Sequence, residues 1–553
     1  MIVRRLLLGA LAALAGCTPP SSSAPSAAPQ SMVAAAHPLA VDAGLDVLRR
    51  GGSAVDAAIA VQMVLGVVEP QSSGLGGGGF LLYYDATSHS ITAYDGREAA
   101  PAGATPDMFL GRDGKPLGFR DAVASGKSVG VPGVLALLEL AHKEHGKRPW
   151  NELFGPAIEA AERGVAVSPR LAAWLDTIKS FREEPAARAI YYNADSSPKK
   201  SGDRIFNPAL AATMRLIAER GPRAFYRGPI AAEMVARVRG HVRPGTLSLA
   251  DLAGYQPIKR AAVCGPYRLW IVCGMPPPSS GGVVILQSLE MLGPFELARE
   301  RPNSLRALHL IAEASRLAFA DRAHYIADPA YVAVPTARLV SADYIAKRRK
   351  LISSDRSMGP VGPGDVGYLE HGTSHMTIVD RAGNAVSFTT TIEAPFGAQM
   401  MVRGFLLNNE LTDFSAVPQR DGRPVANQVE PGKRPRSSMS PTLVLEGDGR
   451  LVAGVGSAGG PRIIGDTLQA LIGMLDWNLS AQAALDLPRV LNMNGPTELE
   501  DTPSLAVQAD RLRALGHEVQ VRRHDGGLTA VRRIGDGWQG GADPRRDGIA
   551  RGE

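Results

Sequence analysis

The sequence predicts an α+β protein in which layers of helices and sheets are stacked on one another. At 553 residues the chain exceeds one typical hydrophobic core, so a large layered fold or several lobes are expected. Apolar residues recur at helical spacing over residues 130–240, whereas short alternating runs joined by glycine turns follow residue 360. A helix-rich first part and a strand-rich last part are typical of stacked layers.

Composition excludes several classes of protein. With 45% hydrophobic and 21% charged residues, the chain has the balance of an ordinary globular protein and not of a disordered one. The net charge of +6 is small for this length, and the basic residues are scattered. The composition therefore does not indicate a nucleic-acid partner.

The N-terminus has the features of an export signal. Two arginines precede a short apolar stretch, LLLGALAAL, which is too short to cross a bilayer. The following LAGC resembles a bacterial lipobox, in which Cys17 is acylated; the alternative is an ordinary signal peptide that contains a cysteine. We expect a signal peptide over residues 1–16, a Pro/Ser/Ala-rich tether over 17–31, and a lipid-anchored protein on the periplasmic side of a bacterial membrane or at the cell surface.

Two further cysteines leave their redox state open. Cys264 and Cys273 flank GPYRLWIV, which could form a hairpin, and an exported protein meets oxidants. A disulfide and two buried thiols are both compatible with this spacing, because strand register decides between them. No cluster of cysteine and histidine has the spacing of a zinc site.

Hydrophobic periodicity predicts the elements in order. The expected helices are a pair over 41–68 broken at Gly51-Gly52, then 133–146, 151–164, 207–221, 228–240, 276–292, 305–326 and a pair within 465–491. The expected strands are 78–86 after a glycine loop, 90–97, 267–275, 375–380, 385–393, 404–409, two within 440–456, and 518–523.

His371 and His375 have the spacing of two metal ligands on one helix face. The run SHMTIVD alternates with period two, however, so the segment is expected to be extended. In a strand, positions four apart lie roughly 13 Å from each other, too far to share one ion. We therefore expect no metal site here and a packed or hydrogen-bonding role for His375.

Two short motifs are also set aside. Gly74, Gly76 and Gly79 satisfy G-x-G-x-x-G, but they follow a helical segment and lead into a strand, the reverse of a dinucleotide site. GKSVG, with Ser128 at its centre, fits the serine-hydrolase elbow. A loop containing Pro132-Gly133 follows it, so a structural turn is favoured.

Seven segments in order resemble the γ-glutamyltranspeptidases (glutathione hydrolases). They are GGSAVDAAIAVQMVLGVVEPQSSGLGGGGF, DGREAAP, MPPPSSGG, GTSHMTIVDRAGNAVSFTTTIE, GFLLNNELTDFS, KRPRSSMSPT and GSAGGPRI. The resemblance runs from about residue 32 to about residue 549. It implies a four-layer αββα sandwich of the N-terminal-nucleophile hydrolase superfamily, built from two subunits of one self-cleaved precursor, with no metal or organic cofactor.

The resemblance also implies the catalytic residues. Cleavage between Gly372 and Thr373 would separate a heavy subunit region (32–372) from a light one (373–553) and make Thr373 an N-terminal nucleophile. A hydroxyl needs a base, and the freed α-amino group of the same residue can serve as one. Thr391 matches the threonine that orients the nucleophile. Gly459 and Gly460 match the diglycine whose N–H groups form the oxyanion hole.

The substrate residues follow in the same way. Arg97, Ser437 and Ser438 match the groups that bind the α-carboxylate of a γ-glutamyl donor, and a guanidinium suits a carboxylate geometrically. Asp413, with Glu410 close by, matches the acidic pair that holds the α-ammonium. Taken singly, the arginine would fit a surface salt bridge and the serines a helix or turn cap.

Two departures from the family pattern bear on specificity. Glu393 stands where the better-known members have asparagine, which adds negative charge beside the amino-group pocket. The segment between Asp413 and Lys433 is shorter than in many members and lacks a tyrosine, which implies a short or absent lid. Such a lid would admit water and bulkier acyl groups.

The resulting hypothesis is a lipid-anchored, self-processing hydrolase/transferase. Its expected partners are a small γ-glutamyl donor such as glutathione, water or an amino-acid acceptor, the two subunits of one precursor, and a membrane reached only through the anchor. The alternatives are an N-acyl amidase of the cephalosporin (glutaryl) acylase type and a non-catalytic envelope lipoprotein.

Overall fold

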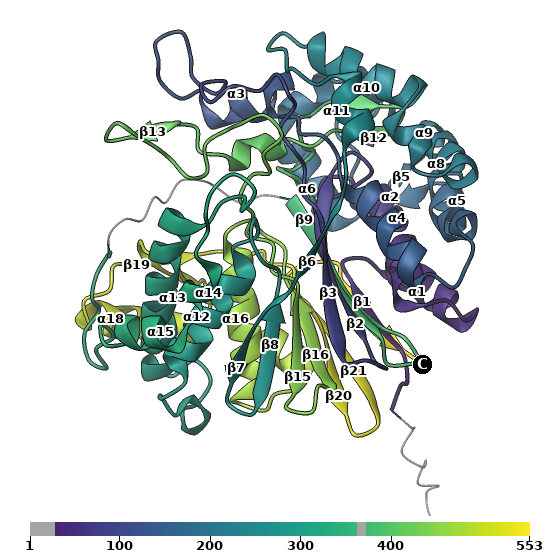
Figure 1. Ribbon diagram of the computed structural model, residues 1–553. Coiled ribbons are helices and arrows are strands. Elements are labelled where there is room, and N and C mark those ends of the chain that lie inside the picture. Colours follow the sequence, from purple (N-terminus) through teal and green to yellow (C-terminus); the bar gives the residue numbers. More distant parts are fainter. Residues whose placement is uncertain (1–27, 362–371) are drawn as a thin grey trace, which may run out of the picture.

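A computed structural model describes residues 28–361 and 372–553. Cys17, most of the expected tether and His371 lie outside the described residues. Two sheets lie face to face, and helices cover the outer side of each (Figure 1). The expected four-layer αββα order is confirmed.

The first sheet has seven strands in the order β22-β1-β9-β10-β2-β3-β6. Their bounds are β1 (Met32–Ala35), β2 (Gly78–Asp85), β3 (Ser90–Gly96), β6 (Ile258–Ala261), β9 (Gly372–Val379), β10 (Ala385–Glu393) and β22 (Ile549–Gly552). All neighbours are antiparallel. The strand that begins at the expected cleavage site therefore lies near the middle of this sheet.

The second sheet has six strands in the order β21-β20-β16-β15-β8-β7. Their bounds are β7 (Val263–Tyr267), β8 (Trp270–Gly274), β15 (Thr442–Glu446), β16 (Leu451–Gly456), β20 (Thr529–Ile534) and β21 (Gly537–Ala542). Smaller sheets pair β4 (Val165–Ala166) with β5 (Arg204–Ile205), β11 (Met401–Val402) with β12 (Phe405–Leu406), β13 (Gln419–Arg420) with β14 (Arg423–Pro424), and β17 (Val490–Asn492) with β18 (Thr497–Glu500) and β19 (Val519–Arg522).

Helices from the two halves of the chain cover opposite faces. The seven-stranded sheet and its flank carry α1 (Pro38–Arg49), α2 (Ala54–Val68), α4 (Val134–His145), α5 (Gly155–Arg163), α6 (Pro169–Thr177), α7 (Pro185–Tyr191), α8 (Pro208–Arg220), α9 (Arg223–Tyr226) and α10 (Pro229–Arg239). The six-stranded sheet carries α12 (Gly281–Leu292), α13 (Leu305–Tyr325), α14 (Thr336–Leu339), α15 (Ala342–Arg349), α16 (Arg462–Leu475), α17 (Ala481–Asp486) and α18 (Pro503–Ala514). Two short helices are α3 (Phe119–Val123) and α11 (Leu249–Gly254).

The two sheets and two helical layers enclose three hydrophobic cores. Leu81 and Tyr83 of β2 pack in the core beneath the first helical layer. Phe80, Leu82 and Tyr84 of the same strand pack in the core between the sheets. Successive side chains of a strand point to opposite faces, so a strand covered on both sides is apolar at every position. This explains the unbroken run FLLYY.

The structure confirms most expected elements and corrects others. The break at Gly51-Gly52 separates α1 from α2, which Ser53 begins with a capping box. The strand expected over 404–409 is only the two-residue β12, and α6, α7, α18 and the C-terminal strands β20–β22 were not anticipated. Cys264 and Cys273 face each other across the β7–β8 hairpin and form a disulfide, so the alternative of two free thiols is wrong. Within the described ranges, helix length and apolarity never reach what a bilayer span requires.

Candidate active site

The expected nucleophile lies at the start of the central strand β9. Thr373 is paired with Thr391 of β10 in the sheet register, and their hydroxyl oxygens are 3.4 Å apart. Residues that face each other in an antiparallel pair project to the same side, so the alternation of both strands brings these hydroxyls together. The structure thus places Thr391 where it can orient Thr373.

A β-bulge between Thr391 and Glu393 lets Glu393 line the site. Glu393 has a φ of 76°, which is uncommon for a residue with a side chain, and its N–H donates to the Thr391 hydroxyl at 2.8 Å. Its carboxylate accepts a hydrogen bond from Asn409. The departure from asparagine at Glu393 therefore adds an acidic group to the wall of the same site.

The glycine loop before β2 permits close packing behind this site. A Cβ on Gly77 would overlap the carbonyl oxygen of Thr391, and a Cβ on Gly78 would lie 2.5 Å from Glu98 Oε2. The loop leads from α2 into a strand, as expected when the dinucleotide motif was set aside. Its glycines let the backbone approach the catalytic strand.

The diglycine expected to form the oxyanion hole links β16 to α16. Gly459 and Gly460 have φ angles of 131° and 61°, in the region that favours glycine. Within the described part of the chain, neither N–H donates a hydrogen bond. Gly460 lines the same cavity as Thr373, next to the positive end of the α16 dipole. This arrangement is suited to a developing oxyanion.

Asp466 of α16 supports this loop from behind. The carboxylate of Asp466 accepts from the Ser457 hydroxyl at 3.1 Å and lies 2.9 Å from Nε2 of His524. Burial acts to lower the pKa of His524, but the Asp466 carboxylate prevails and raises it. The loop is thus anchored to a buried ion pair that sequence motifs did not indicate.

The residues expected to bind the α-carboxylate and the α-ammonium of the donor contact each other. Arg97 is 1% exposed and forms ion pairs with both Glu410 and Asp413. Its remaining hydrogen bonds go to the main-chain oxygens of Pro435 and Arg436, at 3.1 and 3.0 Å. Burial acts to lower the pKa of Arg97, but the two carboxylates raise it overall. The alternative of a surface salt bridge for Arg97 is therefore wrong.

Carboxyl groups outnumber cations in this cluster. Glu98 and Glu393 are buried beside Glu410 and Asp413, and Arg97 is the cation that pairs with the last two. Burial and the neighbouring carboxylates raise the pKa of Glu98 and of Glu393 well above the usual range. The surroundings of Glu98 and Glu393 therefore favour their protonated forms, and a bound ammonium would favour release of the protons.

The two expected carboxylate-binding serines lie in the loop before β15. Met439 N–H donates to the Ser437 hydroxyl oxygen at 3.1 Å, and Arg322 Nη2 donates to the Ser438 hydroxyl oxygen at 2.7 Å. The loop is held against Pro278 and Ser280 by main-chain hydrogen bonds. Neither serine caps a helix, whereas Ser437 does cap its local turn through Met439, so the turn-cap alternative is correct for Ser437.

One cavity of about 1210 Å³ brings the expected residues together. Its lining includes Arg97, Thr373, Thr391, Glu393, Glu410, Asp413, Ser437, Ser438 and Gly460. Gly459 is buried beside Gly460, and Gly372 is the first residue of β9. Residues expected from five separate segments thus converge on one space.

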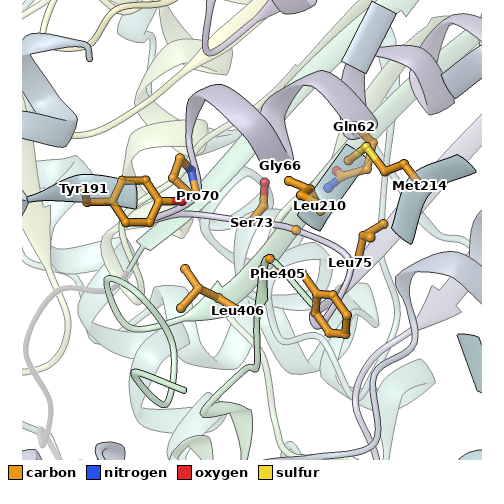
Figure 2. A pocket seen from close by; sticks show the side chains of 12 residues that line it. Gln62, Gly66, Pro70, Ser73, Leu75, Tyr191, Leu210, Met214, Phe405 and Leu406 are labelled. Atoms are coloured by element: carbon orange, nitrogen blue, oxygen red, sulfur yellow. The ribbon is translucent and has the colours of Figure 1, made fainter. Parts of the chain in front are cut away.

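A second pocket lies behind the glycine loop and is too small for a substrate. Figure 2 shows it between Gln62 and Leu75 on one side and Phe405 and Leu406 on the other. Its volume of about 10 Å³ suits at most one water molecule. None of the expected catalytic or substrate residues lines it.

The segment expected to form a short or absent lid is present as a hairpin. Strands β13 and β14 pair, and the segment from Ser415 to Gln428 contributes to the cavity wall. Its tip is exposed. The lid is therefore short, and the large cavity beside it stays open to solvent at one side.

His375 and Ser128 have the packed and structural roles expected of them. His375 is fully buried in β9, and its Nδ1 lies 2.8 Å from the Thr389 hydroxyl. Burial lowers the pKa of His375 to about 3. The Ser128 hydroxyl donates to main-chain carbonyls of its own turn, so it is structural. Among the described residues, no three His, Cys, Asp or Glu side chains form a group that could hold a metal ion.

Arg546 contacts the expected nucleophile, Thr373, and the sequence did not indicate this contact. Its Nη1 donates to the main-chain carbonyl of Thr373 at 2.9 Å, and its Nε donates to the carbonyl of Asp525 at 3.0 Å. Burial, reinforced by Arg170, lowers the pKa of Arg546 to about 10, so it remains charged at neutral pH. Because 173 residues separate the partners, no local pattern could have found this contact.

Comparison with known proteins agrees with this geometry. The family described as Gamma-glutamyltranspeptidase matches residues 40–552. The glutathione hydrolase proenzyme of Bacillus subtilis (strain 168) is 38% identical over 544 residues, covering 94% of this chain and 91% of the relative. The acylase ACY 1 proenzyme of Pseudomonas sp. (strain SE83) is 36% identical over 527 residues, covering 94% and 92%.

A solved structure supports the fold as well as the family. The cephalosporin acylase from Bacillus halodurans superposes with a TM-score of 0.83 at 29% identity, covering 97% of this chain and 98% of that one. The ordered sequence segments, the shared layers and the full-length match have one explanation. This chain belongs to the γ-glutamyltranspeptidase family, and its core is the αββα sandwich of the N-terminal-nucleophile hydrolases.

Proposed function

We propose that the protein is a self-processing hydrolase/transferase that cleaves the γ-glutamyl amide bond of glutathione or related compounds. One observation carries the proposal: the paired threonines, Gly460 of the diglycine and a charged clamp line the same cavity. Family membership supports the reaction class, and relatives named glutathione hydrolase proenzyme support the donor.

Self-cleavage would create the nucleophile. Thr373 Oγ1 attacks the carbonyl carbon of Gly372, the C–N bond breaks, and the hydroxyl proton passes to the departing nitrogen. Water then hydrolyses the resulting ester, which leaves a carboxylate on Gly372 and a free hydroxyl and α-amine on Thr373. The products would be a light chain of 181 residues (373–553) and, after removal of residues 1–16, a heavy chain of 356 (17–372).

Turnover would then use the same hydroxyl. The α-amine of Thr373 accepts the proton from Oγ1 as the oxygen attacks the donor γ-carbonyl, and the N–H groups of Gly459 and Gly460 stabilise the oxyanion. The C–N bond breaks, the proton moves to the leaving amine, and the γ-glutamyl ester remains on Thr373. Water or an acceptor amine resolves the ester and restores the hydroxyl.

The charge of the cavity favours a γ-glutamyl over a glutaryl donor. The two acyl groups differ only in the α-ammonium, which the glutaryl group lacks. The carboxyl cluster of Glu98, Glu393, Glu410 and Asp413 has more acidic groups than Arg97, the cation that pairs with Glu410 and Asp413, can offset. An ammonium would relieve this imbalance, because unlike charges attract strongly in a buried site. The open cavity and the acylase relatives make the glutaryl donor the relevant comparison.

We expect kcat/KM for γ-glutamyl 4-nitroanilide to exceed that for glutaryl 4-nitroanilide by about 100-fold. That ratio corresponds to one well-placed ion pair. Purified, fully cleaved protein is assayed with both anilides by nitroaniline release. Glu393→Asn should reduce the ratio, because it removes one acidic group from the cluster. A wild-type protein that prefers the glutaryl anilide would replace the proposed function with that of an acylase.

We also propose that Cys17 carries a lipid and holds the enzyme on the periplasmic or outer face of the cell. The lipobox-like LAGC and the Pro/Ser/Ala-rich residues 17–31 support this. Mass spectrometry of the heavy chain should find an acylated Cys17 at its N-terminus, and Cys17→Ser should release the enzyme from the membrane fraction. A heavy chain that begins elsewhere without a lipid would rule out the anchor.

A further inference from the structure

The cation expected to bind the donor carboxylate is already engaged. Arg97 pairs with Glu410 and Asp413 and donates to two main-chain oxygens, so its charge is offset before a substrate arrives. A donor α-carboxylate would meet two carboxylates there besides the guanidinium. Another source of positive charge is therefore needed beside Ser437 and Ser438.

Arg322 lies in α13, which covers the six-stranded sheet, and its side chain lines the cavity that also contains Thr373. Its Nη2 donates to the hydroxyl oxygen of Ser438 at 2.7 Å, and its Nε donates to the hydroxyl oxygen of Ser280 at 2.8 Å. In the described ranges, no carboxylate comes close enough to form an ion pair with Arg322. The guanidinium is thus held in place by two serines without being neutralised.

The groups around Arg322 do not supply enough negative charge to offset the positive charge of its guanidinium. Burial and the adjacent Arg436 lower the pKa of Arg322 well below its usual value, and Asp413 opposes them only in part. An arginine keeps its proton under such conditions, so the shift reflects a cation held at a cost in free energy. A bound anion would reduce that cost.

The hydrogen bonds that Ser437 and Ser438 accept show that their O–H groups are available to an anion. The Ser438 oxygen accepts from Arg322, and the Ser437 oxygen accepts from the N–H of Met439. A hydroxyl has one hydrogen to donate in addition to the bonds that it accepts. Each serine on the cavity wall therefore keeps its O–H for a ligand, and the bond from Arg322 makes the Ser438 O–H a stronger donor.

Ser280 links Arg322 to the loop that contains Ser437 and Ser438. Its hydroxyl accepts from Arg322 and donates to the main-chain carbonyl of Ser437 at 2.6 Å, while its N–H donates to the same carbonyl at 2.9 Å. A displacement of Arg322 would thus shift both Ser437 and Ser438. These four residues come from α13, the turn before α12 and the loop before β15.

We propose that Arg322 is a positioning residue for the carboxylate of the acyl donor. It orients Ser438 and, through Ser280, the main chain of Ser437. It also supplies positive charge at this position, because the charge of Arg97 is offset by its acidic partners. The class of ligand is an acyl group with a carboxylate at the position of the glutamyl α-carboxylate, in γ-glutamyl and glutaryl donors alike. This inference rests on the proposed function and assigns a specificity role within it.

The test uses two donors that differ only in this carboxylate, γ-glutamyl 4-nitroanilide and 4-aminobutanoyl 4-nitroanilide. Arg322→Gln should raise KM for the γ-glutamyl donor about 10- to 100-fold, as for loss of a charge-assisted contact. It should change KM for the 4-aminobutanoyl donor less than about threefold. Arg322→Lys should restore part of the difference. The matched control is Arg306→Gln, which removes an exposed arginine from the same helix.

Each outcome decides the inference. Equal losses on both donors would mean a purely structural role, and unchanged constants would mean no role; both overturn the proposal. Should Arg322→Gln fail to fold or self-cleave, Ser438→Ala replaces it, because it must show the same dependence on the donor carboxylate. Nitroaniline release by the wild type is measured first and tests the proposed function independently of Arg322.

Discussion

Thr373→Ala is expected to remain a single chain on a denaturing gel and to release no nitroaniline from any donor. The variant lacks the hydroxyl that attacks the Gly372 carbonyl and therefore also lacks the free α-amine, so both reactions stop together. The wild type should separate into a heavy chain and a light chain of 181 residues (373–553). N-terminal sequencing of the light chain should begin at Thr373.

Three variants separate the chemistry of Thr373 from its position. Thr373→Ser keeps a hydroxyl and should cleave and turn over at a reduced rate. Thr391→Ala removes the hydroxyl 3.4 Å away and should slow cleavage without abolishing it. Arg546→Gln removes the charged bond to the Thr373 carbonyl, which should slow cleavage by about tenfold or more. A Thr373→Ala protein that still yields two chains would exclude this residue as the nucleophile of self-cleavage.

For the wild type, kcat/KM with γ-glutamyl 4-nitroanilide is expected to rise as the pH increases through about 7. Burial raises the pKa of Glu410 to about 7, although Arg97 acts to lower it. Below that pH, Glu410 is protonated and attracts an ammonium weakly. Above it, Glu410 is ionised and attracts the donor. The sign is that of an acid whose ionised form binds a cation.

Glu410→Gln should reduce that rise to the part that deprotonation of the Thr373 α-amine contributes, and it should match the wild type only at low pH. The neutral amide resembles the protonated acid, so the two proteins should diverge above pH 7, to about 100-fold in kcat/KM. Breaking a buried pair with Arg97 can cost about 3–5 kcal/mol of stability, so self-cleavage on a gel serves as the test of folding. Glu233→Gln, which removes an exposed carboxylate paired with Arg403, is the matched control. A Gln variant with an unchanged pH profile would exclude Glu410 as the titrating group.

Elements with strong periodicity could be predicted because their signal is local. The α1–α2 pair, β9, β10 and the β7–β8 hairpin follow from helical or alternating spacing and from glycine turns. Elements such as β1 and β22 could not, because four-residue segments become strands only where a neighbouring strand supplies their hydrogen bonds. The α13 helix was expected, but periodicity did not indicate that its end reaches the active-site cavity.

In the candidate site, too, some features could be predicted from the sequence and others could not. The family resemblance pointed to Thr373, Thr391 and the diglycine, and the structure brings Thr373, Thr391 and Gly460 to one cavity. The sequence could not predict roles that depend on which charged groups lie together, because it does not show which side chains are buried beside one another. Arg97 was expected to face a substrate carboxylate, yet in the structure it is paired with Glu410 and Asp413.

The sequence alone determined the layered α+β class, the family and the position of the expected cleavage site, because ordered motifs and local periodicity carry that information. Only the tertiary structure decided which carboxyl groups lie beside the cavity, that Arg322 lacks an acidic partner among the described residues, and which residues contact Thr373 from the far end of the chain. Arg322 and Ser438 lie 116 residues apart, and Arg546 and Thr373 lie 173 apart. Contacts at that separation, and the desolvation that sets their charge, arise only when the layers pack.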